Sequence, residues 1–167
     1  MRKLSVLFAG TIFLACLIAV TAFKLSAGAP KVSSANGQGG LTLDYMNGQQ
    51  QQFSFHATKD ANGNVSGSWE SNSPGQDIRT HGNIECLTIL ADGKTAVMSG
   101  VVTQVEGNGF PGVTPGAHVW FKVQDNGEGA NATEDTFSDY FFVSTTTCAN
   151  FNVVLHPIDN GNIQVKP

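Results

Sequence analysis

Apolar and polar residues alternate in short runs along most of the chain after residue 30. Strict alternation is typical of a β-strand with one buried and one solvated face, because successive side chains point to opposite sides. No segment repeats its apolar positions with the 3.6-residue period of a helix. The pattern predicts strands at residues 41–45, 53–57, 65–69, 78–90, 95–105 and 117–124, with shorter ones around 137–144, 151–156 and 162–165.

Asn or Asp directly precedes Gly seven times after the apolar N-terminal stretch. Gly adopts a positive φ without steric conflict, and Asn and Asp tolerate it better than most residues. Between alternating runs such a pair is a strong signal for a hairpin. We therefore predict turns at residues 36–37, 47–48, 62–63, 92–93, 108–109, 126–127 and 160–161.

These features together predict one all-β domain. Successive hairpins favour a small antiparallel meander with a barrel-like shape, and a two-sheet β-sandwich is the alternative. Within residues 78–90 the alternation places Ile84 and Cys86 on one face, and His81 and Glu85 on the other.

The first 29 residues predict a signal peptide. Arg2 and Lys3 precede an uncharged apolar run that ends at Phe23, and small residues follow, which favours cleavage between positions 22 and 29. The run is also just long enough to span a bilayer, so an uncleaved signal anchor is the alternative and the one membrane attachment we expect. Residues 30–167 are then a single secreted domain, extracellular or periplasmic.

The charge of this domain limits its partners. Residues 30–167 hold six Lys and Arg against 13 Asp and Glu, a net charge of −7. A protein that binds nucleic acid needs a basic patch to neutralise phosphates, and the sequence has none, so we expect no nucleic-acid partner. A protein, a glycan and a small molecule all remain open.

Two cysteines, Cys86 and Cys148, lie outside the predicted signal peptide. A lone pair in an oxidising compartment most simply forms one disulfide, and the alternative is two buried thiols. The bridge would add roughly 4 kcal/mol in the loop-entropy model.

The segment 125–139 holds five of the 13 acidic residues. Carboxylate oxygens and turns that Gly permits are what Ca²⁺ requires, so Asp125, Glu128, Asp135 and Asp139 are candidate calcium ligands. The spacing is not that of an EF-hand. The alternative is a solvated acidic turn whose Asp and Asn side chains bond to their own backbone.

Five stretches of the chain carry a resemblance to a known family. They are residues 125–129 (D-N-G-E-G), 135–138 (D-T-F-S) and 160–165 (N-G-N-I-Q-V), with a looser likeness at 53–55 (F-S-F) and 81–87 (H-G-N-I-E-C-L). The first three resemble the end of a family of uncharacterised secreted bacterial β-domains, which often follow choice-of-anchor or other surface modules. Residues 130–134 are an insertion relative to the shorter loop of that family. The resemblance implies a secreted β-domain and no catalytic activity.

Three histidines fall on the polar faces of the predicted strands. His56, His81 and His118 share these faces with Arg79 and Trp120, and the five residues form a candidate ligand-binding set. A polar face that lines the mouth or lumen of a small barrel binds polar ligands. A polar face that meets water is the ordinary exposed half of an antiparallel sheet, which is the alternative.

The sequence contains no catalytic motif of the G-x-S-x-G or H-E-x-x-H kind, so we assign no catalytic residue. It favours a non-enzymatic secreted or surface β-domain with a structural or binding role, with calcium as the one cofactor considered. A small-ligand-binding barrel that uses the His56, His81 and His118 face is the first alternative. A small barrel enzyme is the second.

Overall fold

The computed structural model describes residues 32–43, 48–109, 112–129 and 131–167. Within these ranges the chain forms ten strands and one short 3-10 helix, and no α-helix, which confirms the predicted all-β class. The elements are β1 (Ser33–Leu43), β2 (Gln49–Lys59), β3 (Val65–Ser73), η2 (Pro74–Gln76), β4 (Ile78–Ile89), β5 (Thr95–Gly107), β6 (His118–Gln124), β7 (Thr136–Phe137), β8 (Phe141–Val143), β9 (His156–Pro157) and β10 (Asn160–Lys166).

The predicted signal peptide, residues 1–29, lies outside the described ranges, as does Asn47 of the second predicted turn. In the part of the chain that is described, no helix is long and apolar enough to cross a membrane.

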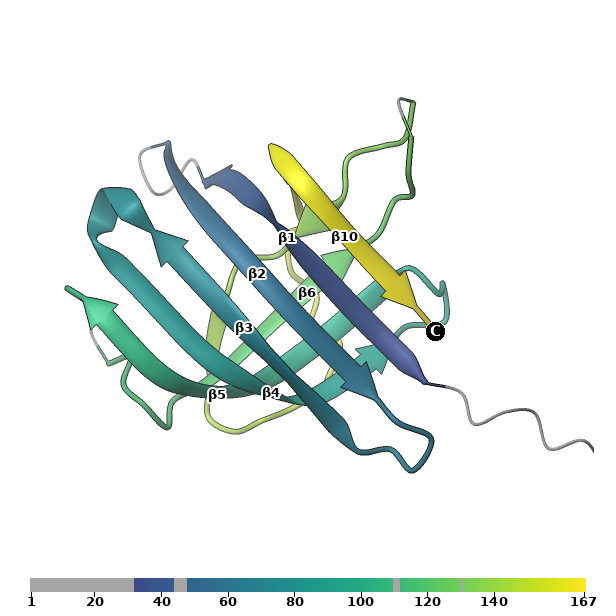
Figure 1. The fold of residues 1–167 in the computed structure, drawn as a ribbon, viewed down its shortest axis with the longest axis horizontal. Helices are drawn as coiled ribbons and strands as arrows, with labels where there is room; N and C mark the ends of the chain where they lie inside the picture. The colour runs from purple at the N-terminus through teal and green to yellow at the C-terminus, as the bar shows by residue number, and fades with distance from the viewer. Residues whose placement is uncertain (1–31, 44–47, 110–111, 130) are drawn as a thin grey trace, which may run out of the picture.

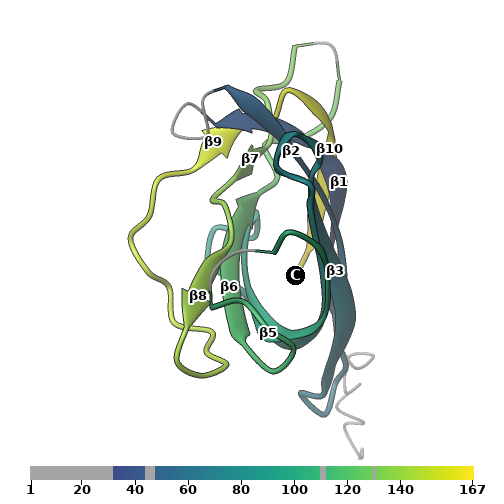
Figure 2. The ribbon, with the colours of Figure 1, turned by 90° about the vertical axis from the view of Figure 1, so that its left-hand side faces the viewer.

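The strands form one curled antiparallel sheet. From β1 to β6 each strand pairs with the next along the chain, and β10 returns to pair with β1. Figure 1 looks onto the layer formed by β10, β1, β2 and β3, and Figure 2 shows β6, β7 and β8 in a second layer behind it. Strands β4 and β5 turn the sheet from one layer to the other, so the predicted barrel-like meander is confirmed as a half-barrel.

Aromatic side chains pack between the two layers. Phe53 of β2 lies 4.5 Å from Phe137 of β7, between ring centroids, and Phe137 lies 5.5 Å from Phe121 of β6. Phe55 and Tyr140 extend the cluster through edge contacts with Phe121. Burying each Phe stabilises the fold by about 1.5–3 kcal/mol, and aromatic pairs at these distances add to this. These rings hold the layers together and occupy the interior.

Strand β1 is much longer than the predicted strand at 41–45. The prediction is too short because three glycines hide the alternation of apolar and polar residues in the first part of the strand. A Cβ on Gly37 would lie 2.6 Å from the Phe55 ring, and one on Gly39 would lie 3.1 Å from the Phe53 ring. These positions must lack side chains for the rings to pack against β1. The turn predicted at residues 36–37 is therefore wrong, since the pair lies in the middle of a strand.

Two of the predicted hairpin turns connect long strands as expected. Gly63 between β2 and β3 has a φ of +88°, and Gly93 between β4 and β5 has a φ of +69°. Asp92 fixes the second turn by accepting from the backbone N–H groups of Lys94 and Thr95. Positive φ at these positions is what the Asx-Gly pairs predicted.

A register shift in the β4–β5 pair changes which side chains share a face. The pairing skips one residue between Ile84, opposite Gly100, and Cys86, opposite Ser99. Ile84 therefore points into the core while Cys86 lies on the outer face, so the prediction that they share a face is wrong. A β-bulge of this kind reverses the alternation that follows it.

The disulfide Cys86–Cys148 is present, with 5.8 Å between the two Cα atoms. It ties β4 to residues 144–155, a segment that we call the strap, which crosses the outer face of β6 (Figure 2). The strand predicted at 151–156 is wrong except at His156, because residues 151–155 of the strap belong to no strand. A disulfide is compatible with an extracellular or periplasmic location.

The outer edge of β10 is held by carboxylates instead of a further strand. Oδ2 of Asp135 accepts from the backbone N–H of Ile163 at 2.7 Å, and Oδ2 of Asp125 accepts from that of Val165 at 3.0 Å. Asp125 directly follows β6 and Asp135 directly precedes β7. The connection between these strands therefore joins the two ends of the curled sheet.

Replacing Asp135 with Ala is expected to lower the free energy of unfolding by about 3 kcal/mol, because the backbone N–H groups of Asn126 and Ile163 lose their acceptor. Urea denaturation measures the change. Glu134→Ala is the control, since the Glu134 side chain is exposed, and should change the free energy by less than about 0.5 kcal/mol. A loss under about 1 kcal/mol for Asp135→Ala would contradict the role of this carboxylate in holding the edge of β10.

Candidate functional site

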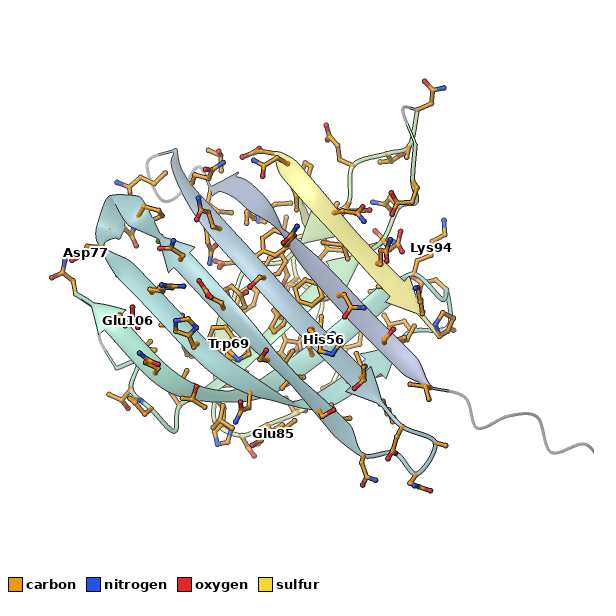
Figure 3. All side chains as sticks on the ribbon, in the orientation of Figure 1. His56, Trp69, Asp77, Glu85, Lys94 and Glu106 are labelled. Carbon is orange, nitrogen blue, oxygen red and sulfur yellow. A yellow bond between two sulfur atoms is a disulfide. The ribbon has the colours of Figure 1, made fainter. Side chains whose placement is uncertain are left out.

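Two adjoining hollows lie on the outer face of β10, β1, β2, β3 and β4, which faces the viewer in Figure 3. They have volumes of about 720 and 350 Å³ and share Gln38, Ser54 and Glu70. We call them together the trough. The polar residues that line the larger hollow are Asn36, Gln38, Ser54, His56, Ser68, Glu70, His81, Asn83, Thr103, Asn162 and Gln164.

The trough follows from the alternation of the strands that form it. In β2 the Phe53 and Phe55 rings point to the interior, so Ser54 and His56 point outward. The same alternation turns Trp69 inward, where it packs on Tyr140. One face of each strand thus builds the core, and the other supplies the polar lining.

Cross-strand pairing arranges this lining in two rows. Residues that pair directly on one face have Cβ atoms about 5 Å apart, so each row is a continuous line of contacts. The first row crosses β10, β1, β2, β3 and β4 in the order Gln164, Asn36, His56, Ser68 and Asn83. The second row crosses the same strands in the order Asn162, Gln38, Ser54, Glu70 and His81.

Hydrogen bonds and ion pairs hold several side chains of the rows in place. Nδ1 of His56 is hydrogen-bonded to Oδ1 of Asn36. Oε1 of Glu70 lies 2.8 Å from a guanidinium nitrogen of Arg79, and Oε2 lies 3.5 Å from Nδ1 of His81. Of the described residues that line the larger hollow, Glu70 is the one carboxylate, and it is already paired with Arg79 and His81.

The hollow shape follows from side-chain length. Ser54 stands at the centre of the second row, between Gln38 and Glu70, and Ser68 stands between His56 and Asn83 in the first row. Gly40 adds depth to the smaller hollow, because a Cβ at this position would lie 3.0 Å from the side chain of Gln50. These short side chains among longer ones leave an open hollow on the outer face of the curled sheet.

Three of the five predicted ligand-binding residues meet at the trough. His56 and His81 line it, and Arg79 lies beside it through its pair with Glu70. His118 and Trp120 belong to β6, in the second layer, and line neither hollow. The structure does not bring these two together with the other three, because the curl of the sheet turns the outer face of β6 away from that of β2 (Figure 2).

The strap covers the outer face of β6. Trp120 is fully buried, its Nε1 donates to the carbonyl of Ala149 at 3.0 Å, and its ring contacts Phe141 and Phe151. Nδ1 of His118 lies 3.0 Å from Oγ1 of Thr146. These residues anchor the strap, which is a structural role.

The four candidate calcium ligands are not gathered around one point. Asp125 and Asp135 bond to the backbone of β10, and Oε1 of Glu128 accepts from the side chains of Asn162 and Gln164 at 3.0 and 3.4 Å. Among the described residues, no group of three or more His, Cys, Asp or Glu side chains is placed to hold a metal ion. The calcium site stays a prediction, and these contacts give it no support.

Asp139, the fourth candidate, lies in a different environment. Burial raises the pKa of its carboxyl to about 6, while the backbone N–H of Tyr140 and the charge of His156 lower it. That N–H donates to Oδ1 at 2.6 Å, and the residue has a φ of +79°. The carboxyl is therefore held next to the aromatic core instead of in an open cation site.

Comparisons with known proteins identify no relative. No family model, no curated protein and no solved structure matches the chain. The resemblance to secreted bacterial β-domains therefore stays a prediction, and the proposed site depends on the geometry alone.

Most of the trough residues were not singled out in the sequence. Ser54, Ser68 and Asn83 share the period-2 face of His56 and His81, so the alternation could have identified them. Asn36, Gln38, Asn162 and Gln164 could not be found in this way, because they become neighbours of β2 only through the pairing of β1 and β10.

Protonation of Asp139 is expected to make the stability of the fold depend on pH. Its folded pKa of about 6 lies above the ordinary value of 3.8. The folded protein thus binds this proton more tightly than the unfolded chain does. The proton on Asp139 therefore stabilises the fold fully below about pH 4. This stabilisation is lost as the pH rises through about 6, and the stability changes little at higher pH.

Urea denaturation between pH 4 and 7 measures this loss, which we expect to be on the order of 2 kcal/mol. Asp139→Asn should remove it, because Asn stays uncharged and tolerates a positive φ. Glu134→Gln, at an exposed position, should leave it unchanged. An equal loss in Asp139→Asn would show that another group causes the pH dependence.

Proposed function

We propose that this chain is a non-enzymatic, secreted binding module whose site is the trough. One observation carries the proposal: two unbroken rows of polar side chains cross five strands and surround a hollow of about 720 Å³. A ligand in this hollow would meet hydrogen-bonding groups from every strand of the layer.

The type of side chain distinguishes this face from an ordinary solvated one. Exposed sheet faces commonly carry long charged residues, especially Lys and Glu. Of the described residues that line the two hollows, Glu70 is the one with a permanent charge, and Arg79 pairs with it. Amide and hydroxyl groups at short range fix the orientation of a ligand without a large cost of removing charge from water.

The interior of the half-barrel supports the first alternative less well. The Phe53, Phe121 and Phe137 rings pack there at centroid distances of 4.5 and 5.5 Å, where a lumen ligand would have to lie. Trp120, which a lumen site would place beside a cavity, lies under the strap and lines neither hollow.

The lining of the trough also favours binding over catalysis. Acid–base hydrolysis of a glycosidic bond uses two carboxyl groups on opposite sides of that bond. Of the described residues that line the trough, Glu70 is the one carboxylate. The predicted signal peptide and the disulfide Cys86–Cys148 support the secreted location.

An NMR titration of the ¹⁵N-labelled domain tests the proposal. The panel contains chemically different probes: maltohexaose, a hexapeptide, adenosine monophosphate and calcium chloride, each up to about 10 mM, since weak sites have Kd values near 1 mM. We expect saturable shifts from at least one organic probe at the backbone amides of Ser54, Ser68 and Asn83. No probe should be chemically altered.

Two results would contradict the proposal. One is a set of saturable shifts confined to the strap or the core, which would move the site to another part of the domain. The other is the absence of saturable shifts at the three trough amides for every organic probe. Turnover of a probe would instead support the enzyme alternative.

A further inference from the structure

We infer that the trough takes a neutral, polyhydroxylated chain, that is, a segment of an uncharged oligosaccharide or polysaccharide. This inference rests on the proposed binding function and specifies its ligand. It follows from the hydrogen-bonding character, the charge and the shape of the trough.

The lining groups match hydroxyl groups in their hydrogen-bonding character. A primary amide offers both a donor and an acceptor, and so does a hydroxyl. Five amide side chains and three hydroxyl side chains line the larger hollow, including Gln38, Ser54, Ser68 and Asn83. A sugar hydroxyl likewise donates and accepts, so each lining group can pair with it in either direction. A ligand with acceptors alone, such as a phosphate, would pair with the donors of these groups and leave their acceptors without a partner.

The charges of the trough exclude strongly charged ligands. An anion would meet the carboxylate of Glu70, and of the described residues that line the trough none is Lys or Arg. A cation would compete with Arg79, which already lies 2.8 Å from that carboxylate. Removing either kind of ion from water costs several kcal/mol unless a partner replaces the lost hydration. The uncharged class of ligand remains.

A folded protein partner fits the trough poorly. Protein interfaces depend on exposed aromatic, Met or Arg anchors that fill pockets. The aromatic residues that line the trough, Phe53, Phe55 and Trp69, are at most 5% exposed and belong to the core. The same lack of a stacking ring limits the affinity for a sugar, so we expect a Kd on the order of 1 mM per site.

The shape of the trough favours a chain over a single ring. The two hollows adjoin along the strands, and on β2 they extend from Gln50 to His56. The six residue-to-residue steps from Gln50 to His56 span about 20 Å, which is longer than one hexose. A linear saccharide lying along β2 would contact both rows and both hollows.

Matched serine substitutions test this inference. Ser54→Gln and Ser68→Gln place larger polar side chains inside the larger hollow of the trough, which both serines line. Ser34→Gln makes the same change on the same face of β1, at a position that lines neither hollow. Thermal melts confirm that each variant folds. NMR titrations then use cellohexaose, maltohexaose, an acidic hexagalacturonate and a hexapeptide as probes.

We expect a neutral hexasaccharide to shift trough amides saturably, with at least tenfold weaker binding in Ser54→Gln and Ser68→Gln and unchanged binding in Ser34→Gln. Binding of the acidic saccharide or the peptide in the trough, without a neutral saccharide, would overturn the ligand class and leave the binding function standing. No saturable shift in the trough with any probe would overturn both. Equal weakening in all three variants would overturn the placement of the saccharide in the trough.

Discussion

Backbone N–H groups on the free edge of β10 donate to the carboxylates of Asp125 and Asp135, and the arrangement of the rest of the sheet depends on these hydrogen bonds. An unpaired strand edge exposes backbone N–H groups that would otherwise recruit another chain. Here Ile163 and Val165 donate to carboxylates that flank the connection from β6 to β7. Two side chains thus do what a further strand would do in a closed barrel, and they join the layers around the aromatic core.

This closure also builds one wall of the trough. Asn162 and Gln164 are the β10 members of the two polar rows, and their amide groups donate to Oε1 of Glu128 in the same acidic segment. The segment that fixes β10 therefore also orients the outermost lining groups. The core contributes from the other side, since the Phe53 and Phe55 rings set which residues of β2 face outward. The polar site and the apolar core are two faces of one set of strands.

Local features of the sequence were sufficient for the fold class and for the turns at residues 62–63 and 92–93, because these depend on alternation and on the backbone freedom of Gly. The length of β1 was not predictable, since Gly37 is explained by the Phe55 ring of a neighbouring strand. The role of Asp135 was missed for a similar reason. Its carboxylate resembles a metal ligand until its partner, a backbone N–H 28 positions away, is known.

Amide hydrogen exchange at Ile163 and Val165 tests the closure most directly, because these N–H groups face away from β1. If the carboxylates hold the edge, both amides exchange as slowly as those in the centre of β2. In Asp135→Ala, the exchange rate at Ile163 then rises much more than the exchange rates in β2. Exchange at both amides near the rate of an unstructured chain in the unmodified protein would contradict the account.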